Sequence, residues 1–174
     1  LLNIPFATLF AWGEAVVVQP DGKIVVAGEA VNGSGQNLDF SFFVMRFGPT
    51  GIFDPTFGTN GVVSTPLDGA EVTGMVLQPD GRIVVSGGAK VSRSGIVDGV
   101  LLRYTSGGVL DPTFGGTGRV GIAVGDHSVL NGVALQGDGR VVAVGDTTVG
   151  TRQDIVVVRY SATGVPDPSF DADG

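Results

Sequence analysis

A ten-residue segment that occurs three times limits what this chain can fold into more than any other feature. It is QPDGKIVVAG at residues 19–28, QPDGRIVVSG at 78–87 and QGDGRVVAVG at 136–145. An apolar run precedes each turn and a second one follows it, and short β-branched runs favour strands. In the turn, the aspartate side chain can form a hydrogen bond with nearby backbone groups, and the glycine can adopt the left-handed conformation of a tight turn. Each copy is therefore predicted to form a β-hairpin.

Other residues recur with the same period, so the whole chain is a tandem repeat. The repeated glutamines lie 59 and 58 residues apart, and an arginine and an aspartate recur at 57 and 56. These residues are Gln19, Gln78 and Gln136, then Arg46, Arg103 and Arg159, then Asp54, Asp111 and Asp167. Self-similarity at a fixed period indicates a repeat architecture. We expect one domain over residues 1–174, with units at about 11–66, 67–124 and 125–174.

Each unit contains four candidate strands. The third strand is FSFFVMRF at 40–47, GVLLRY at 99–104 or IVVVRY at 155–160. The second and third strands are apolar on both alternating faces, which predicts a sheet that is covered on both sides. The fourth strand is more polar and contains Pro66 in the first unit, as suits an edge. The pattern predicts an all-β fold, a β-propeller with three four-stranded blades.

The ends of the chain lead to a prediction about assembly. The last unit stops before its fourth strand, and residues 1–10 are similar to the fourth strand of the first unit. Propellers have about four to eight blades, so three cannot close a ring. Each large apolar side chain left in water forgoes about 1.5–3 kcal/mol. We expect a homodimer with a six-bladed ring, in which residues 1–10 complete the last blade of the partner, or a segment of a longer array.

The motifs QPDGKIVVAG, RF or RY, DPTFG and NGVV together resemble the bacterial delta-60 repeat. The resemblance covers all three units. It implies a tandem propeller-type repeat of a large exported or surface-associated bacterial protein, and it brings no catalytic residues. The third unit departs from the pattern, with Gly137 in place of proline and Asp171 in place of the glycine after Phe170. We expect an extracellular or cell-surface location and an unchanged fold.

Composition narrows the possible functions. The net charge is −7 and there are two lysines, which argues against a nucleic-acid partner. There is no cysteine, no apolar run long enough for a membrane span and a single histidine, His127, in an expected loop. We predict no metal, no cofactor and no catalytic residue. Trp12 is the sole tryptophan, and a packing role is favoured over stacking on a ligand.

The repeated aspartates and arginines have a structural and a functional interpretation. A ring of carboxylates could hold a cation, but Asp-Pro is typical of a turn. We therefore expect each DPTF or DPSF segment to place its phenylalanine beneath a blade. An arginine on a half-buried strand needs a partner, so each is predicted to bond a carboxylate or carbonyl of its own or a neighbouring unit.

The connections between the second and third strands differ most between units, so they are the predicted binding face. They cover residues 29–38, 88–97 and 146–153. The candidate binding residues at this face are Arg93, Asp98, Arg152, Asp154 and Asp39. We expect a non-catalytic binding or scaffolding module whose partner is a protein or a glycan. The alternatives are a carboxylate-based, glycan-active enzyme at the propeller channel and a component of a surface fibre or array.

Overall fold

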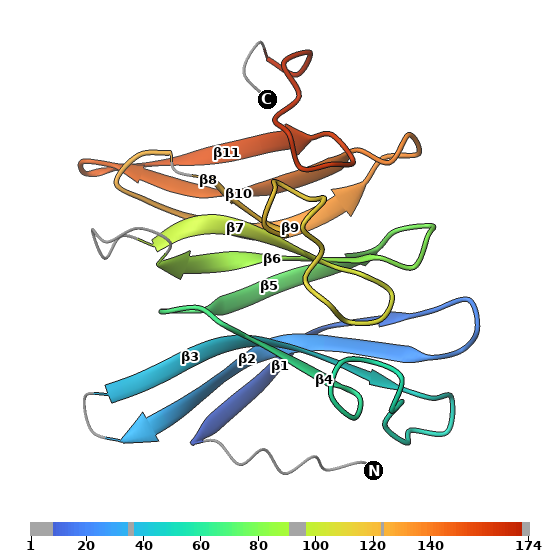
Figure 1. Cartoon of the computed structure of the whole chain (residues 1–174). Coiled ribbons are helices and arrows are strands. Elements are labelled where there is room, and N and C mark those ends of the chain that lie inside the picture. The colour runs from blue at the N-terminus through green and yellow to red at the C-terminus, as the bar shows by residue number, and fades with distance from the viewer. Residues whose placement is uncertain (1–8, 35–36, 91–96, 123, 172–174) are drawn as a thin grey trace.

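The computed structural model describes residues 9–34, 37–90, 97–122 and 124–171. Three antiparallel β-sheets lie one above another, in chain order from bottom to top (Figure 1). We call them blades 1, 2 and 3. The all-β propeller fold predicted from the repeats is confirmed. Within the described ranges there is no helix that could cross a membrane.

The strands of each blade pair with their neighbours in chain order. Blade 1 contains β1 (Phe10–Val18), β2 (Ile24–Ser34), β3 (Asn37–Phe47) and β4 (Val62–Pro66). Blade 2 contains β5 (Glu71–Leu77), β6 (Ile83–Lys90), β7 (Val97–Tyr104) and β8 (Arg119–Ile122). Blade 3 contains β9 (His127–Leu135), β10 (Val141–Val149) and β11 (Arg152–Tyr160). The four expected strands are present in blades 1 and 2, with Pro66 at the end of the edge strand β4.

The three predicted hairpins join the first two strands of every blade. In each turn the backbone N–H of the glycine donates to the glutamine carbonyl, over 2.9 to 3.0 Å. The three glycines have φ between 82° and 88°, where a side chain would be strained. The aspartate before each glycine accepts from the backbone N–H two residues ahead. The repeated Asp-Gly pair therefore sets the turn geometry.

Burial follows the position of each blade in the stack. In blade 2, Val84 and Leu101 face blade 3 and Val85 and Leu102 face blade 1, all fully buried. Complete coverage is thus confirmed for the middle blade. The outer faces of blades 1 and 3 expose valines, although Phe43, Met45 and Phe47 on the outer face of blade 1 are buried. The exposed fractions are 64% for Val16, 66% for Val18, 43% for Val144 and 46% for Val157.

The blades present two different ends. The motif end carries the hairpin turns and the connections after the third strands. The variable end carries the connections between second and third strands, and β4 also ends there, because Pro66 pairs with Ser41 near the start of β3. Lys90 at the end of β6 donates its backbone N–H to the carbonyl of Asp68. The connection from blade 1 to blade 2 therefore crosses the variable end.

The strands extend further toward the variable end than the sequence predicts. β2 and β3 remain paired from Ile24 and Phe47 out to Ser34 and Asn37, and β10 and β11 are joined by a turn at Gly150. Backbone pairing continues past the apolar runs because it needs no apolar side chain. The predicted long connections are thus wrong for blades 1 and 3.

Two further expectations are changed by the strand bounds. His127 is exposed as expected, but it begins β9 and does not lie in a loop. Phe10, expected in the outer strand of another copy, pairs with Val31 in the first two strands of blade 1. Leu9 donates its backbone N–H to the same Val31. Residues 1–8 of that expected outer strand lie outside the described residues, so strand exchange stays a prediction.

Candidate functional site

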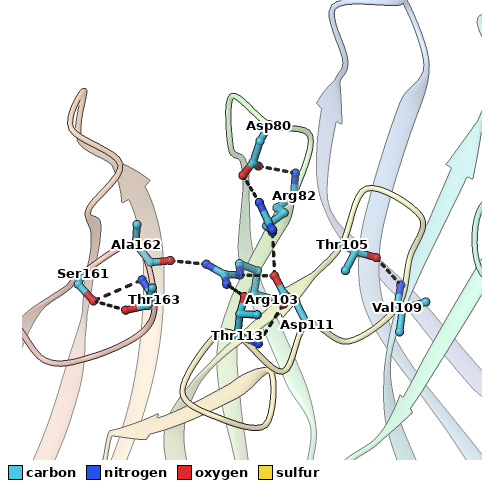
Figure 2. Close-up of polar contacts among 10 residues, drawn as sticks. All are labelled: Asp80, Arg82, Arg103, Thr105, Val109, Asp111, Thr113, Ser161, Ala162 and Thr163. Carbon is cyan, nitrogen blue, oxygen red and sulfur yellow. Dashed lines mark hydrogen bonds and ion pairs between the residues drawn. The ribbon is translucent and has the colours of Figure 1, made fainter.

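The motif end of blade 2 is built around the buried carboxylate of Asp111 (Figure 2). Its Oδ2 accepts from Arg103 Nε at 3.0 Å and from Arg82 Nε at 2.8 Å. Its Oδ1 accepts from the backbone N–H and the hydroxyl of Thr113, at 3.0 and 2.7 Å. The Arg103 guanidinium also lies 4.7 Å from the ring centre of Phe114. Every lone-pair direction of the carboxylate is therefore directed at a protein donor.

Blades 1 and 3 repeat this arrangement. Nε of Arg46 lies 2.9 Å from Asp54, and Nε of Arg159 lies 2.8 Å from Asp167. Hydrogen bonds from the hydroxyl and backbone of Thr56 lower the pKa of Asp54 well below its usual range. The predicted turns and arginine partners are confirmed.

The other two carboxyl groups shift in the same direction. Burial raises the pKa of Asp111, but bonds from Thr113 and the arginine charges outweigh it, leaving that pKa at about 2. Bonds from Ser169 and the charges of Arg140 and Arg159 lower the pKa of Asp167 to about 2. These carboxylates stay ionised and bonded near neutral pH, so none is a general acid. Across the described residues no group of three or more His, Asp or Glu is placed to hold a metal ion.

The same arginines connect each blade to the next. Nη1 of Arg46 donates to the carbonyl of Ser106 in blade 2 at 2.6 Å, and Nη1 of Arg103 donates to the carbonyl of Ala162 in blade 3 (Figure 2). Beside these bonds, Gly58 N–H donates to Gly107 and Gly115 N–H to Thr163, both at 2.9 Å. The repeated arginines and aspartates of the motif end therefore hold each blade together and connect it to the next.

The predicted site residues do not form one cluster. Asp39 is exposed on β3 of blade 1, whereas Arg152 and Asp154 form a 2.6 Å ion pair on β11 of blade 3. Asp98 was expected at the surface but is only 7% exposed at the start of β7. Arg93 lies outside the described residues. Blade 2 separates Asp39 from the Arg152–Asp154 pair, so these residues do not belong to one site.

Asp39 lies in an open groove at the variable end between blades 1 and 2. The groove has a volume of about 940 Å³. It is lined by Leu38, Asp39, Phe40, Pro66, Leu67, Asp68 and Lys90. Lys90 Nζ lies 3.7 Å from Asp68, and both side chains are more than one third exposed. The groove combines apolar walls with two carboxylates and one ammonium group.

An aromatic pair on β1 is a site element that the sequence did not predict. The rings of Phe10 and Trp12 stack with centres 5.6 Å apart, and they are 59% and 45% exposed. Trp12 pairs with Glu29 on β2, and directly paired residues share a face of a sheet. Trp12 thus packs on Phe10, as the favoured packing role expects, but it also leaves part of its ring exposed.

Glu29 connects this aromatic pair to blade 2. Its Oε2 accepts the backbone N–H of Val72 at 3.0 Å. Burial raises the pKa of Glu29, and the nearby charges of Glu14 and Glu71 raise it further. These three are the only glutamates in the chain, whereas the other acids are aspartates. The sequence could have indicated this group, because its three glutamates, unlike many of the aspartates, lie outside the Asp-Gly and Asp-Pro turns.

Polar side chains continue from there toward blade 3. Glu71 lines a second, smaller cleft of about 230 Å³ between blades 2 and 3. Its other lining residues are His127, Val129, Asn131, Asp146, Thr148 and Gln153. The amide of Asn131 donates to Asp146 at 2.6 Å. The variable end thus presents carboxylates, amides and an imidazole beside exposed aromatic rings.

A family model matches residues 19–57, 78–114 and 136–170. Each match begins at the glutamine before a hairpin turn and ends at the phenylalanine beneath the arginine. The chain belongs to the family described as "Domain of unknown function (DUF5122) beta-propeller". This membership confirms propeller-type repeats in all three units. No curated protein matches the chain.

Proposed function

We propose that this DUF5122 propeller is a non-catalytic binding module that holds a glycan at the variable end of its blades. The observation that carries the proposal is the exposed Phe10–Trp12 stack beside the carboxylate of Glu29. Aromatic faces offer apolar area to the C–H faces of a sugar, and carboxylates accept bonds from its hydroxyls. The groove at Asp39 and Lys90 also combines apolar side chains with carboxylates, and it reaches from blade 1 to blade 2.

The motif end supports the proposal by its contrast with the variable end. Its carboxylates are buried and bonded to arginines of the repeat, so its charged groups contribute to packing. We further propose that the module is a delta-60-type repeat of an exported or surface-associated bacterial protein, where glycans are abundant. The repeat motifs and the propeller fold support this assignment.

Fluorescence titration tests glycan binding directly, because Trp12 is the only tryptophan. A panel of neutral and charged oligosaccharides is titrated into the protein while tryptophan emission is followed. Binding at the stack is expected to change the emission saturably with at least one glycan. If no member of the panel changes the emission or gives heat in calorimetry, while a protein partner is captured, the glycan proposal is wrong.

Variants locate the site in calorimetry. Trp12→Ala and Glu29→Gln are expected to weaken binding at least tenfold, because each removes a proposed contact. Val109→Ala is the matched control, since Val109 is 64% exposed at the opposite end of blade 2. Equal affinities for Trp12→Ala and Val109→Ala would contradict a site at the variable end.

A second function, a carboxylate-based glycan-active enzyme, is favoured by the environment of Glu29. Burial and the negative charges of Glu14 and Glu71 raise the pKa of Glu29, which is the direction expected of a catalytic acid. The test is the release of new reducing ends or unsaturated products from the same glycan panel. Product formation that Glu29→Gln abolishes, while binding persists, would favour the enzyme over the binding module.

A further inference from the structure

The contact between successive blades occurs twice within the chain with the same parts. The arginine of one blade donates to a backbone carbonyl in the turn of the next blade. The residue after the phenylalanine of the first blade donates its backbone N–H to the next carbonyl of that same turn. The phenylalanine under each arginine packs against the glycine of that turn. A Cβ on Gly108 would lie 3.0 Å from the Phe57 ring, and one on Gly164 would lie 2.9 Å from Phe114.

The outer faces of blades 1 and 3 present the two halves of a third such contact. The repeat places Pro49, Thr50 and Gly51 of blade 1 where blade 2 has its accepting turn. A Cβ on Gly51 would meet nothing within 4 Å, although its φ of 82° matches that of Gly108. In the described part of the chain, no acceptor lies opposite Arg159 Nη1. Among the described residues, Arg159 Nη1 on blade 3 and the turn at residues 49–51 on blade 1 thus have no partner of this kind.

The remaining parts of the donor half are also in place. Asp171 has a φ of 52°, matching 53° for Gly58 and 58° for Gly115, whose N–H groups make the bonds between blades. The Arg159 guanidinium lies 4.8 Å from the Phe170 ring, as in the other two blades. The side chain of Arg159, which no described blade covers, is 18% exposed, against 4% for that of Arg103.

We infer that blade 3 of one copy docks on blade 1 of a second copy, and that two such contacts close a six-bladed ring. In each contact Arg159 Nη1 donates to the carbonyl of Pro49, Asp171 N–H donates to that of Thr50, and Phe170 covers Gly51. One chain supplies both complementary halves, so a second copy satisfies both at once. The exposed valines of the two outer faces are buried by the same contact, and six blades lie within the usual range.

Solution mass is the first test, and it does not depend on the proposed glycan site. Two chains of 17.7 kDa give a particle of about 35 kDa in analytical ultracentrifugation. This mass is expected to persist as the protein is diluted, and to be the largest species present. A monomer at all concentrations overturns the inference, and so does a series of growing polymers, which would indicate an open fibre.

Surface variants test which faces meet. Val18→Asp and Val157→Asp each place a charge on one outer face, where the side chain is exposed in the single chain. Each variant is expected to be a folded monomer, as judged by an unchanged circular dichroism spectrum. Val109→Asp, on a valine that is 64% exposed at the motif end of blade 2, is expected to remain dimeric. Dimers in all three variants would contradict the proposed interface.

Two further variants test the individual contacts. Arg159→Lys keeps an ammonium group for Asp167 but removes the Nη1 donor, and it is expected to weaken dimerisation at least about tenfold. Because the chain has no cysteine, Thr50→Cys with Asp171→Cys introduces a single possible disulfide per contact. Oxidation is expected to yield a closed covalent dimer. Reduced monomers alone, or a ladder of linked chains, would refute the closed ring.

Discussion

Replacing Asp111 with alanine tests whether the motif-end clusters stabilise the stack. The substitution removes the acceptor for Arg103 Nε at 3.0 Å and for Arg82 Nε at 2.8 Å. It also leaves the backbone N–H and hydroxyl of Thr113 without the carboxylate. The side chain of Arg103 is only 4% exposed, so its charge stays buried without the carboxylate that pairs with it.

Removing one partner of a buried ion pair costs about 3–5 kcal/mol, because the remaining charge cannot be solvated. A domain of this size has a free energy of unfolding of about 5–15 kcal/mol. Asp111→Ala is therefore expected to lower the free energy of unfolding by about 3 kcal/mol or more. For 150–250 residues, each kcal/mol corresponds to about 2–4 °C in Tm, so Tm falls by about 6 °C or more.

Asp167→Ala is the matched control within the same chain. The equivalent Arg159 is more exposed, so water can solvate part of its charge after the substitution. A loss of about 1 kcal/mol is expected, as for an ion pair near the surface. Urea unfolding followed by circular dichroism measures the difference, with both substitutions made in the monomeric Val18→Asp background so that no second copy covers Arg159. If both variants lose the same free energy of unfolding, the cost of the substitution does not depend on whether the next blade covers the arginine.

The remaining predictions concern pH and one glycine. The folded-state pKa values of Asp54, Asp111 and Asp167 lie below the ordinary 3.8, so their stabilisation is present above about pH 5 and is lost as pH falls toward 2. The urea midpoint should follow that decline, with a shallower slope in Asp111→Ala. Gly87→Ala should destabilise the fold by more than about 1 kcal/mol, because its Cβ would lie 1.9 Å from the carbonyl O of Glu71. Gly107→Ala, whose Cβ would come no nearer than 3.9 Å to another group, should unfold like the original chain.

The repeat period predicted the fold because every local signal in a unit agrees with the same architecture. The Asp-Gly turns fix three hairpins, and the apolar second and third strands require layers on both sides. The need of a half-buried arginine for a partner also predicted that Arg46 bonds a carboxylate or a carbonyl, and the structure shows bonds to both, at Asp54 and Ser106. These inferences depend on local geometry and burial, which the sequence encodes directly.

The candidate site was harder to predict because it depends on register and on contacts between blades. Asp98 and Asp154 precede the repeated arginine by five residues, but Asp39 precedes its arginine by seven. Ser41 is therefore the residue of blade 1 that corresponds to Asp98. Asp39 lies two residues further along the strand, toward the open groove, whereas Asp98 is buried. Similarly, Glu29 meets the backbone of Val72 only after blades 1 and 2 have stacked.

The repeated arginine explains why a single blade of this kind is incomplete. Its Nε bonds an aspartate of its own blade, while its Nη1 needs a carbonyl of the following blade. The exposed fraction of this side chain is 8% in blade 1 and 4% in blade 2, but 18% in blade 3. Each cluster is thus closed by the next blade, which makes stability a sum of nearest-neighbour terms. In the described part of the chain this rule leaves the arginine of blade 3 and the turn of blade 1 without their partners, and the proposed closed ring would supply both.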